Sequence, residues 1–217
     1  MTAMGLTTLS AYLSDWALGG ATRVAVATTV EALAASSIDM SALVAKGALG
    51  GKFGRITARA GEFDEQKEID VLANESILAA LKTAPVAAFA SEEMAEPMML
   101  DDKAPLLVAA DPLDGSSNVE ANVSFGMIFS VLPRHPSSTG EAAFLRPGSH
   151  QLAAGFMVYG PHTVLVLTVG NGTNIFTLDP ATRTFYLTHP KVAVPPSTDE
   201  YAINASNARY WDEPIRS

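Results

Sequence analysis

The sequence predicts a layered domain that combines α-helices with a mixed, largely antiparallel β-sheet. Three observations support this: an apolar, Ala-rich first stretch, an acidic stretch with helical spacing in the middle, and a series of short apolar runs after it. Helices followed by strands are the order typical of an α+β protein. We therefore expect an α/β fold of the α+β kind, with N-terminal helices packed on one sheet.

The N-terminal and middle stretches predict helices. Residues 22–36 are Ala-rich, and residues 37–47 begin with Ser and end on Gly, as a capped helix does. A third helix is predicted over residues 64–84, where apolar residues recur at helical spacing. Acidic residues gather near the start of this stretch, which suits the positive end of a helix dipole.

Short apolar runs predict the strands, at residues 86–90, 106–110, 124–132, 152–160, 163–170 and 174–178. Gly-Pro and Asn-Gly dipeptides separate the last three runs, a pattern typical of hairpins. Residues 147–178 carry no Asp, Glu, Lys or Arg. Because turns divide this stretch into pieces of strand length, it predicts a buried sheet and not a membrane span.

The composition excludes several classes of site and partner. The 217 residues include no cysteine, which excludes disulfides, thiolate metal sites and cysteine nucleophiles. The net charge of −9 and the lack of a basic face argue against a nucleic-acid partner. No signal peptide or membrane segment stands out, so we expect a cytoplasmic protein without a membrane partner. Residues 62–120 hold 14 of the 23 Asp and Glu, a local excess of the kind that a site for hard cations requires.

The stretch DPLDGSSN, residues 111–118, carries the strongest chemical signal. Asp111 follows a predicted buried strand, at the edge of the sheet where ligands gather in α/β proteins. Asp111 and Asp114 repel each other unless a cation lies between them, and the Leu113 carbonyl is free to turn toward the same point. These oxygen ligands suit Mg²⁺ or Mn²⁺. The alternative is a turn that an Asp side chain caps.

The second half of this stretch predicts an anion site. If a short helix begins at Gly115, Ser116 and Ser117, its free N–H groups and the two hydroxyls face the same corner, and phosphate is the expected anion. Carboxylates that bind a metal ion would lie next to backbone N–H groups that bind phosphate. This combination indicates metal-assisted phosphoryl transfer.

A second acidic element follows residues 86–90. Glu92 and Glu93 offer the further ligands that a two-metal site needs, with a solvated loop as the alternative. Asp64 and Asp70, at the acidic start of the predicted third helix, are weaker candidates, and helix capping is the alternative for Asp64.

The stretches FDEQKEIDVLAN, ASEEM, DPLDGSSNVEANVSFGMIFSVLP and YAINASNARYWDEPIR occur in this order. Together they resemble class I fructose-1,6-bisphosphatases, strongly over residues 60–217 and weakly over 1–60. The late segments are most similar to bacterial members associated with carbon fixation. The resemblance implies a layered αβαβα sandwich of the sugar-phosphatase type, which is usually assembled as a homotetramer.

The resemblance also implies roles for single residues. The loop that holds the departing phosphate is matched by Asp114, Gly115, Ser116 and Ser117. Glu93 and Asp70 match the residues that activate water, and Asn204 matches a contact to the retained phosphate. The metal ligands are matched by Glu92, Asp111, the Leu113 carbonyl, Asp114 and Asp64.

The implied activity is Mg²⁺-dependent hydrolysis of the 1-phosphate of fructose 1,6-bisphosphate to fructose 6-phosphate, as in gluconeogenesis or the Calvin cycle. Two or three Mg²⁺ ions would act, with Mn²⁺ as an alternative. Sedoheptulose 1,7-bisphosphate is an alternative or second substrate. A different reading is a non-catalytic fragment that binds metal and phosphate.

Family chains run on for about another third, so the resemblance predicts a division into two domains. We expect residues 1–193 to form an N-terminal domain with the metal and phosphate site. Residues 194–217 would begin a sugar-phosphate domain that is cut short. On this reading, the 217 residues alone are weakly active or inactive.

Overall fold

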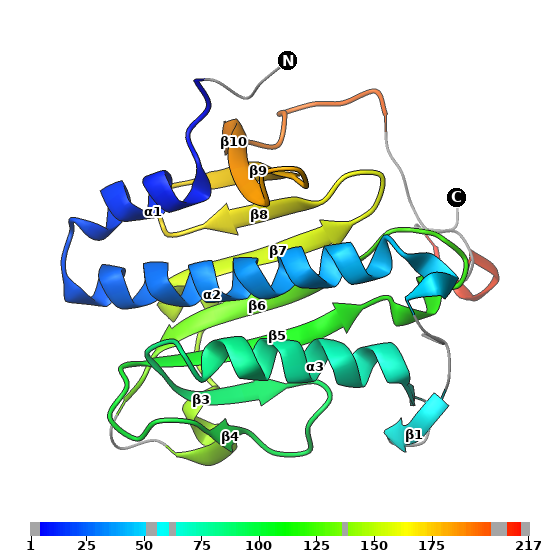
Figure 1. Ribbon diagram of the computed structural model, residues 1–217, viewed down its shortest axis with the longest axis horizontal. Helices are drawn as coiled ribbons and strands as arrows, with labels where there is room; N and C mark the ends of the chain where they lie inside the picture. The colour runs from blue at the N-terminus through cyan, green and yellow to red at the C-terminus, as the bar shows by residue number, and fades with distance from the viewer. Residues whose placement is uncertain (1–4, 51–55, 61–63, 136–138, 201–207, 214–217) are drawn as a thin grey trace.

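The structure is a computed structural model that describes residues 5–50, 56–60, 64–135, 139–200 and 208–213 (Figure 1). Within these residues the chain forms a layer of α-helices on one face of an eight-stranded sheet, with a separate two-stranded sheet. The predicted class, N-terminal helices against a mixed, largely antiparallel sheet, is confirmed. The described residues thus supply one helix layer and one sheet layer of the predicted sandwich.

The N-terminal helices are α1, Leu9–Ala17, and α2, Ala21–Val44. The predicted helix break between residues 36 and 37 is wrong, because α2 runs through it. The hydroxyls there serve packing and not capping: Ser36 Oγ lies 2.8 Å from Ser76 Oγ, and Ser37 Oγ donates to Met127 Sδ at 3.9 Å.

The third helix is α3, Glu68–Leu81, so the prediction that it begins at residue 64 is wrong. Residues Asp64–Lys67 form strand β2, which pairs with β1, Ile56–Ala60. The apolar spacing that predicted the helix starts only at Ile69, and the acidic residues before it are compatible with a strand once β1 satisfies their backbone.

The large sheet has the order β10-β9-β8-β7-β6-β5-β3-β4, in which only the β3–β5 pair is parallel. Each of the six apolar runs forms a strand, as predicted, whereas the short edge strand β4 and the long edge strand β10 were not predicted. The strands are β3 Val86–Ser91, β4 Met98–Met99, β5 Leu106–Asp114, β6 Phe125–Pro133, β7 Ala153–Tyr159, β8 Val164–Thr168, β9 Thr173–Asp179 and β10 Thr184–Val192.

Short 3₁₀ helices complete the description: η1 Gly47–Leu49, η2 Ser116–Asn118, η3 Gly140–Ala143, η4 Gly148–His150 and η5 Ala208–Tyr210. The sheet ends at Val192, and the domain boundary after residue 193 stays a prediction. Of the helices in the described ranges, none combines the length and the apolar character needed to cross a bilayer.

The three α-helices cover the same face of the large sheet (Figure 1). Helix α1 packs near β10, α2 near β7, and α3 against β3 and β5. Between the layers lies the main core, whose fully buried side chains include Leu33, Phe89, Met157 and Phe176. This arrangement leaves the opposite face to be covered by other parts of the chain.

Cover on the opposite face is partial. At β3, β5 and β6 a small second core forms under η3, from Ala87, Ala88, Ala104, Leu107, Leu132 and Ala143, with Phe144 against it. Further along the same face the side chains of Ile128 and Phe156 are 48% and 43% exposed. The sheet face is therefore open to solvent beside this second core.

Candidate active site

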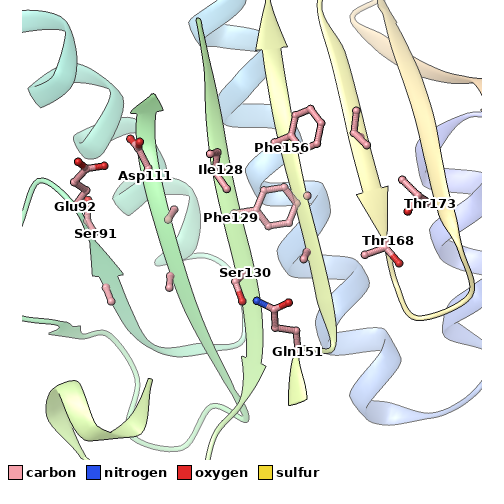
Figure 2. Close-up of a pocket in the computed structure, with 16 residues that line it drawn as sticks. Ser91, Glu92, Asp111, Ile128, Phe129, Ser130, Gln151, Phe156, Thr168 and Thr173 are labelled. Atoms are coloured by element: carbon pink, nitrogen blue, oxygen red, sulfur yellow. The ribbon is translucent and has the colours of Figure 1, made fainter. Parts of the chain in front are cut away.

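The parallel pair β3 and β5 creates the site, because parallel neighbours end at the same edge of the sheet. Glu92 follows the last residue of β3, and its backbone N–H donates to the Ala110 carbonyl at 3.2 Å. Asp111 comes next on β5, so the two acidic side chains start from adjacent positions. Figure 2 shows both carboxyl groups at this edge, directed toward each other.

Asp111 behaves as half of a carboxyl pair. The pKa of Asp111 is raised from 3.8 to about 7, first by burial and then by a hydrogen bond with the Glu92 side chain and by the charges of Glu92 and Asp114. The Leu113 N–H, which donates to Asp111 Oδ1 at 3.0 Å, lowers it in part. This hydrogen bond forms the Asp-capped turn that the sequence analysis gave as the alternative to a cation site. The turn and the carboxyl pair are therefore both present.

A β-bulge brings Asp114 to the same side of β5 as Asp111. In a regular strand, residues three apart face opposite sides. Here Asp111 pairs with Ile128 and Asp114 with Gly126, so β5 contains one extra residue between the two pairs. Because cross-strand partners share a face, both acidic residues lie on the open face. The sequence does not reveal this bulge, although Pro112 is a residue type that sheets tolerate at such points.

The predicted turn after Asp114 is present. Gly115 has φ +82°, a left-handed conformation that side chains other than glycine rarely adopt, and η2 follows directly. The N–H of Asn118 donates to the Gly115 carbonyl at 2.8 Å. Ser116 is half-buried and Ser117 is exposed, so the start of the turn is accessible to a ligand.

The water-activating candidates lie near this edge on different elements. The side chain of Glu93 is half-buried, and its N–H donates to Ser91 Oγ at 3.2 Å. Asp70 is 3% exposed in the first turn of α3. Because only residues 82–85 join α3 to β3, the helix runs antiparallel to the strand, and its first turn lies toward the edge where β3 ends (Figure 1).

Two predicted residues remain without a structural test. Asp64 begins β2, but its side chain lies outside what the structure describes. Asn204 lies outside the described residues altogether. Their predicted roles as a metal ligand and a phosphate contact stay predictions.

The donor set agrees in part with a hard cation. Its oxygens come from carboxylates, and a cation would offset the burial and the neighbouring negative charges that raise the pKa of Asp111. In the described part of the chain, however, no three Asp, Glu or His side chains gather closely enough to hold a metal by themselves. A complete site needs the Leu113 carbonyl, a rearrangement at Asp114, or Asp64.

A cavity of about 630 Å³ extends from the carboxyl pair across the open sheet face (Figure 2). Its lining is mostly apolar, from β3, β5, β6, β7, β8 and the start of β9, with polar side chains at Ser130, Gln151, Thr168 and Thr173. Sequence reasoning missed these four residues. Their alternation with buried residues was visible, but nothing in the sequence indicates which face of a sheet stays open.

Comparison with known proteins gives a consistent result. The model of the family described as "Fructose-1-6-bisphosphatase, N-terminal domain" matches residues 21–190. The class 1 fructose-1,6-bisphosphatase of Azorhizobium caulinodans is 50% identical over 215 residues, covering 96% of this chain and 65% of the relative. The corresponding protein of Rhodopseudomonas palustris (strain HaA2) is 51% identical over 210 residues, covering 96% and 60%.

Solved structures agree in fold. The crystal structure of Leishmania major fructose-1,6-bisphosphatase in holo form superposes with a TM-score of 0.85 at 30% identity, covering 96% of this chain and 66% of that one. The apo form gives a TM-score of 0.80 at 28% identity. The chain thus spans somewhat less than two thirds of the length of the relatives it matches.

Proposed function

The chain belongs to the fructose-1,6-bisphosphatase family, and on that premise we propose that it carries the metal and phosphate site of a Mg²⁺-dependent phosphatase. The reaction is hydrolysis of the 1-phosphate of fructose 1,6-bisphosphate. One observation carries the proposal: the carboxyl pair Glu92–Asp111 lies a few residues from the left-handed turn at Gly115, so groups for a cation and for a phosphate share one edge.

The acidic residues hold the cation. The proposed ligands are the side chains of Glu92, Asp111 and Asp114 and the Leu113 carbonyl, with Asp64 as an additional one. When bound, Mg²⁺ neutralises phosphate charge and lowers the pKa of a bound water. Asp111 would have to be deprotonated to act as a ligand, so cation binding would compete with the raised pKa of that carboxyl group.

The turn holds the phosphate that is removed. Gly115 has no side chain to obstruct an anion, and the N–H groups and hydroxyls of Ser116 and Ser117 donate to its oxygens. Fixed donors of this kind stabilise charge that develops in the transition state without reorganising.

Glu93 and Asp70 act on the attacking water. Glu93 is half-buried next to the metal ligand Glu92, where it accepts a proton from a water on the substrate side. Asp70 is buried at the start of α3 and orients this group or the water.

The assay compares the 217-residue chain with a chain extended to the length of its relatives. We expect phosphate release from fructose 1,6-bisphosphate by the extended chain in the presence of Mg²⁺, with sedoheptulose 1,7-bisphosphate as a parallel substrate. Asp111→Asn should reduce turnover by about 10²-fold or more, whereas Asp15→Asn, a change at an exposed residue of α1, should not. Equal turnover in wild type and Asp111→Asn would contradict the proposal.

We expect the 217 residues alone to be weakly active or inactive, since the described residues offer no basic clamp for the second phosphate. Substrate binding energy at that phosphate would otherwise position the scissile bond. Equal specific activity of the two chains would overturn this. At full length we propose a cytoplasmic homotetramer, which light scattering of the extended chain tests.

A further inference from the structure

We propose that Asn118 is a positioning residue whose side-chain amide holds the turn of residues 115–118 in the conformation that binds phosphate. The proposal rests on the function proposed for that turn. Asn118 ends η2 with a half-buried side chain, and neither the motif analysis nor the resemblance gave it a role.

Asn118 joins both ends of the segment that separates the turn from β6. Its backbone N–H donates to the Gly115 carbonyl at 2.8 Å, and its carbonyl accepts from Val123 N–H at 3.0 Å. Its side-chain Nδ2 donates to the Ser124 carbonyl at 3.0 Å. Three polar groups of one residue therefore close the ten-residue excursion from 115 to 124.

The far end of this excursion adjoins the sheet. Ser124 directly precedes β6, whose first residue, Phe125, pairs with Tyr159 of β7 and packs its ring 5.4 Å from the Tyr159 ring. Both rings are buried. The amide of Asn118 thus ties the turn to the sheet.

The amide also packs directly behind the turn. A Cβ placed on Gly115 would lie 3.3 Å from Asn118 Nδ2 and 3.6 Å from Phe125 Cβ. Gly115 is therefore enclosed between the amide and the start of β6. Because Gly115 has access to several backbone conformations, this contact and the hydrogen bond select the left-handed one.

The effect belongs to phosphate and not to the cation. The N–H groups of Ser116 and Ser117 can converge on an anion only if the turn is fixed before the anion arrives. Glu92 directly follows β3, and Asp111 and Asp114 both pair with residues of β6, so the proposed carboxylate ligands are held by the sheet. Loss of the amide should consequently weaken phosphate binding and leave cation binding unchanged.

The test uses Asn118→Leu and Asn118→Asp, which both remove the N–H donor, the first without charge and the second with it. Glu120→Ala, a change at an exposed residue of the same excursion, is the matched control. Calorimetry with Mn²⁺ alone, and then with inorganic phosphate at saturating Mn²⁺, measures the two affinities. Amide hydrogen exchange over residues 115–124 reports the turn, and thermal unfolding reports the fold.

We expect phosphate affinity to fall between about three- and ten-fold in Asn118→Leu, the factor that corresponds to one neutral hydrogen bond. It should fall further in Asn118→Asp, where a carboxylate replaces the donor opposite the Ser124 carbonyl and adds a negative charge to the turn that binds the anion. Exchange over 115–124 should accelerate in both, while Mn²⁺ affinity stays within about two-fold of wild type. Glu120→Ala should match wild type.

Unchanged phosphate affinity or unchanged exchange in both variants overturns the proposal. Equal losses of Mn²⁺ and phosphate affinity, with a lower unfolding temperature, overturn it as well, because they indicate a merely structural residue. Failure of the proposed function looks different: the wild-type chain then binds no phosphate at saturating Mn²⁺, and both proposals fall together.

Discussion

The half-buried position of Asp111 on β5 makes the free energy of unfolding depend on pH. In the folded, metal-free chain its pKa is raised from 3.8 to about 7, first by burial and then by the hydrogen bond with Glu92. Between these two values the folded state holds a proton that the unfolded state has released. Stability therefore falls as the pH rises from about 4 to about 7 and levels off above that.

This gives the first prediction. Asp111→Asn should remove that part of the pH dependence and raise the free energy of unfolding at pH 8, on the order of 1 kcal/mol, since partial exposure reduces the cost of holding the charge in the folded state. Denaturant unfolding at pH 5 and pH 8 in the presence of a chelator measures it. Added Mn²⁺ should stabilise the wild type at pH 8 and not the variant. A variant that is less stable than wild type at pH 8 would disprove the account.

Gly115 gives the second prediction. Gly115→Ala places a methyl group on a left-handed residue, which costs about 1–2 kcal/mol, and crowds the Asn118 amide from 3.3 Å. Gly170→Ala is the matched control, because Gly170 has φ +87° but no neighbour within 4 Å. Both variants should lose stability by similar amounts, and only Gly115→Ala should lose phosphate affinity in calorimetry. Equal phosphate affinities would mean that the turn does not bind the anion.

At the scale of elements, the sequence predicted what depends on local pattern. The apolar runs 86–90 and 106–110 became β3 and β5, and the acidic residues after them met because the two strands are parallel neighbours. The bulge between Asp111 and Asp114 depends on pairing with β6, which no local pattern records. Strand β10 was missed because Thr188, His189, Pro190 and Lys191 break the expected alternation.

Helix α2 shows why the predicted break failed and gives the third prediction. It is packed between α1, α3 and the sheet, so burial along its length outweighs the two serines in its centre. Leu33→Ala, at a fully buried position, should cost about 2–5 kcal/mol. Leu18→Ala, at a residue 83% exposed, should cost less than about 0.5 kcal/mol. Urea unfolding compares them, and similar losses would mean that α2 is not packed as described.

At the scale of the whole molecule, the edges of the sheet are better protected than its open face. At β10 the N-terminal segment adds a hydrogen bond from Leu187 N–H to the Thr7 carbonyl at 2.8 Å, and register shifts follow Leu187. At the other edge, β4 has only two residues. Short or irregular edges resist pairing with another chain. The open face, with Ile128 and Phe156 over the cavity, has no comparable protection within the described residues.

We therefore expect association of the 217-residue chain through this face and not through its edges. Exposed apolar patches bind apolar dyes and promote association, so Phe156→Ser should lower both dye fluorescence and the average mass in light scattering. Its free energy of unfolding should change by less than about 1 kcal/mol, because the ring is already 43% exposed. Val24→Ser is the control, at a 52% exposed position on the outer surface of α2, on the helical side of the molecule. It should leave both signals unchanged. If Val24→Ser lowers association as much as Phe156→Ser, the contact lies on the helical side. In a chain of the relatives' length, weaker dye binding by the wild type would indicate that the additional residues cover the face that carries Glu92 and Asp111.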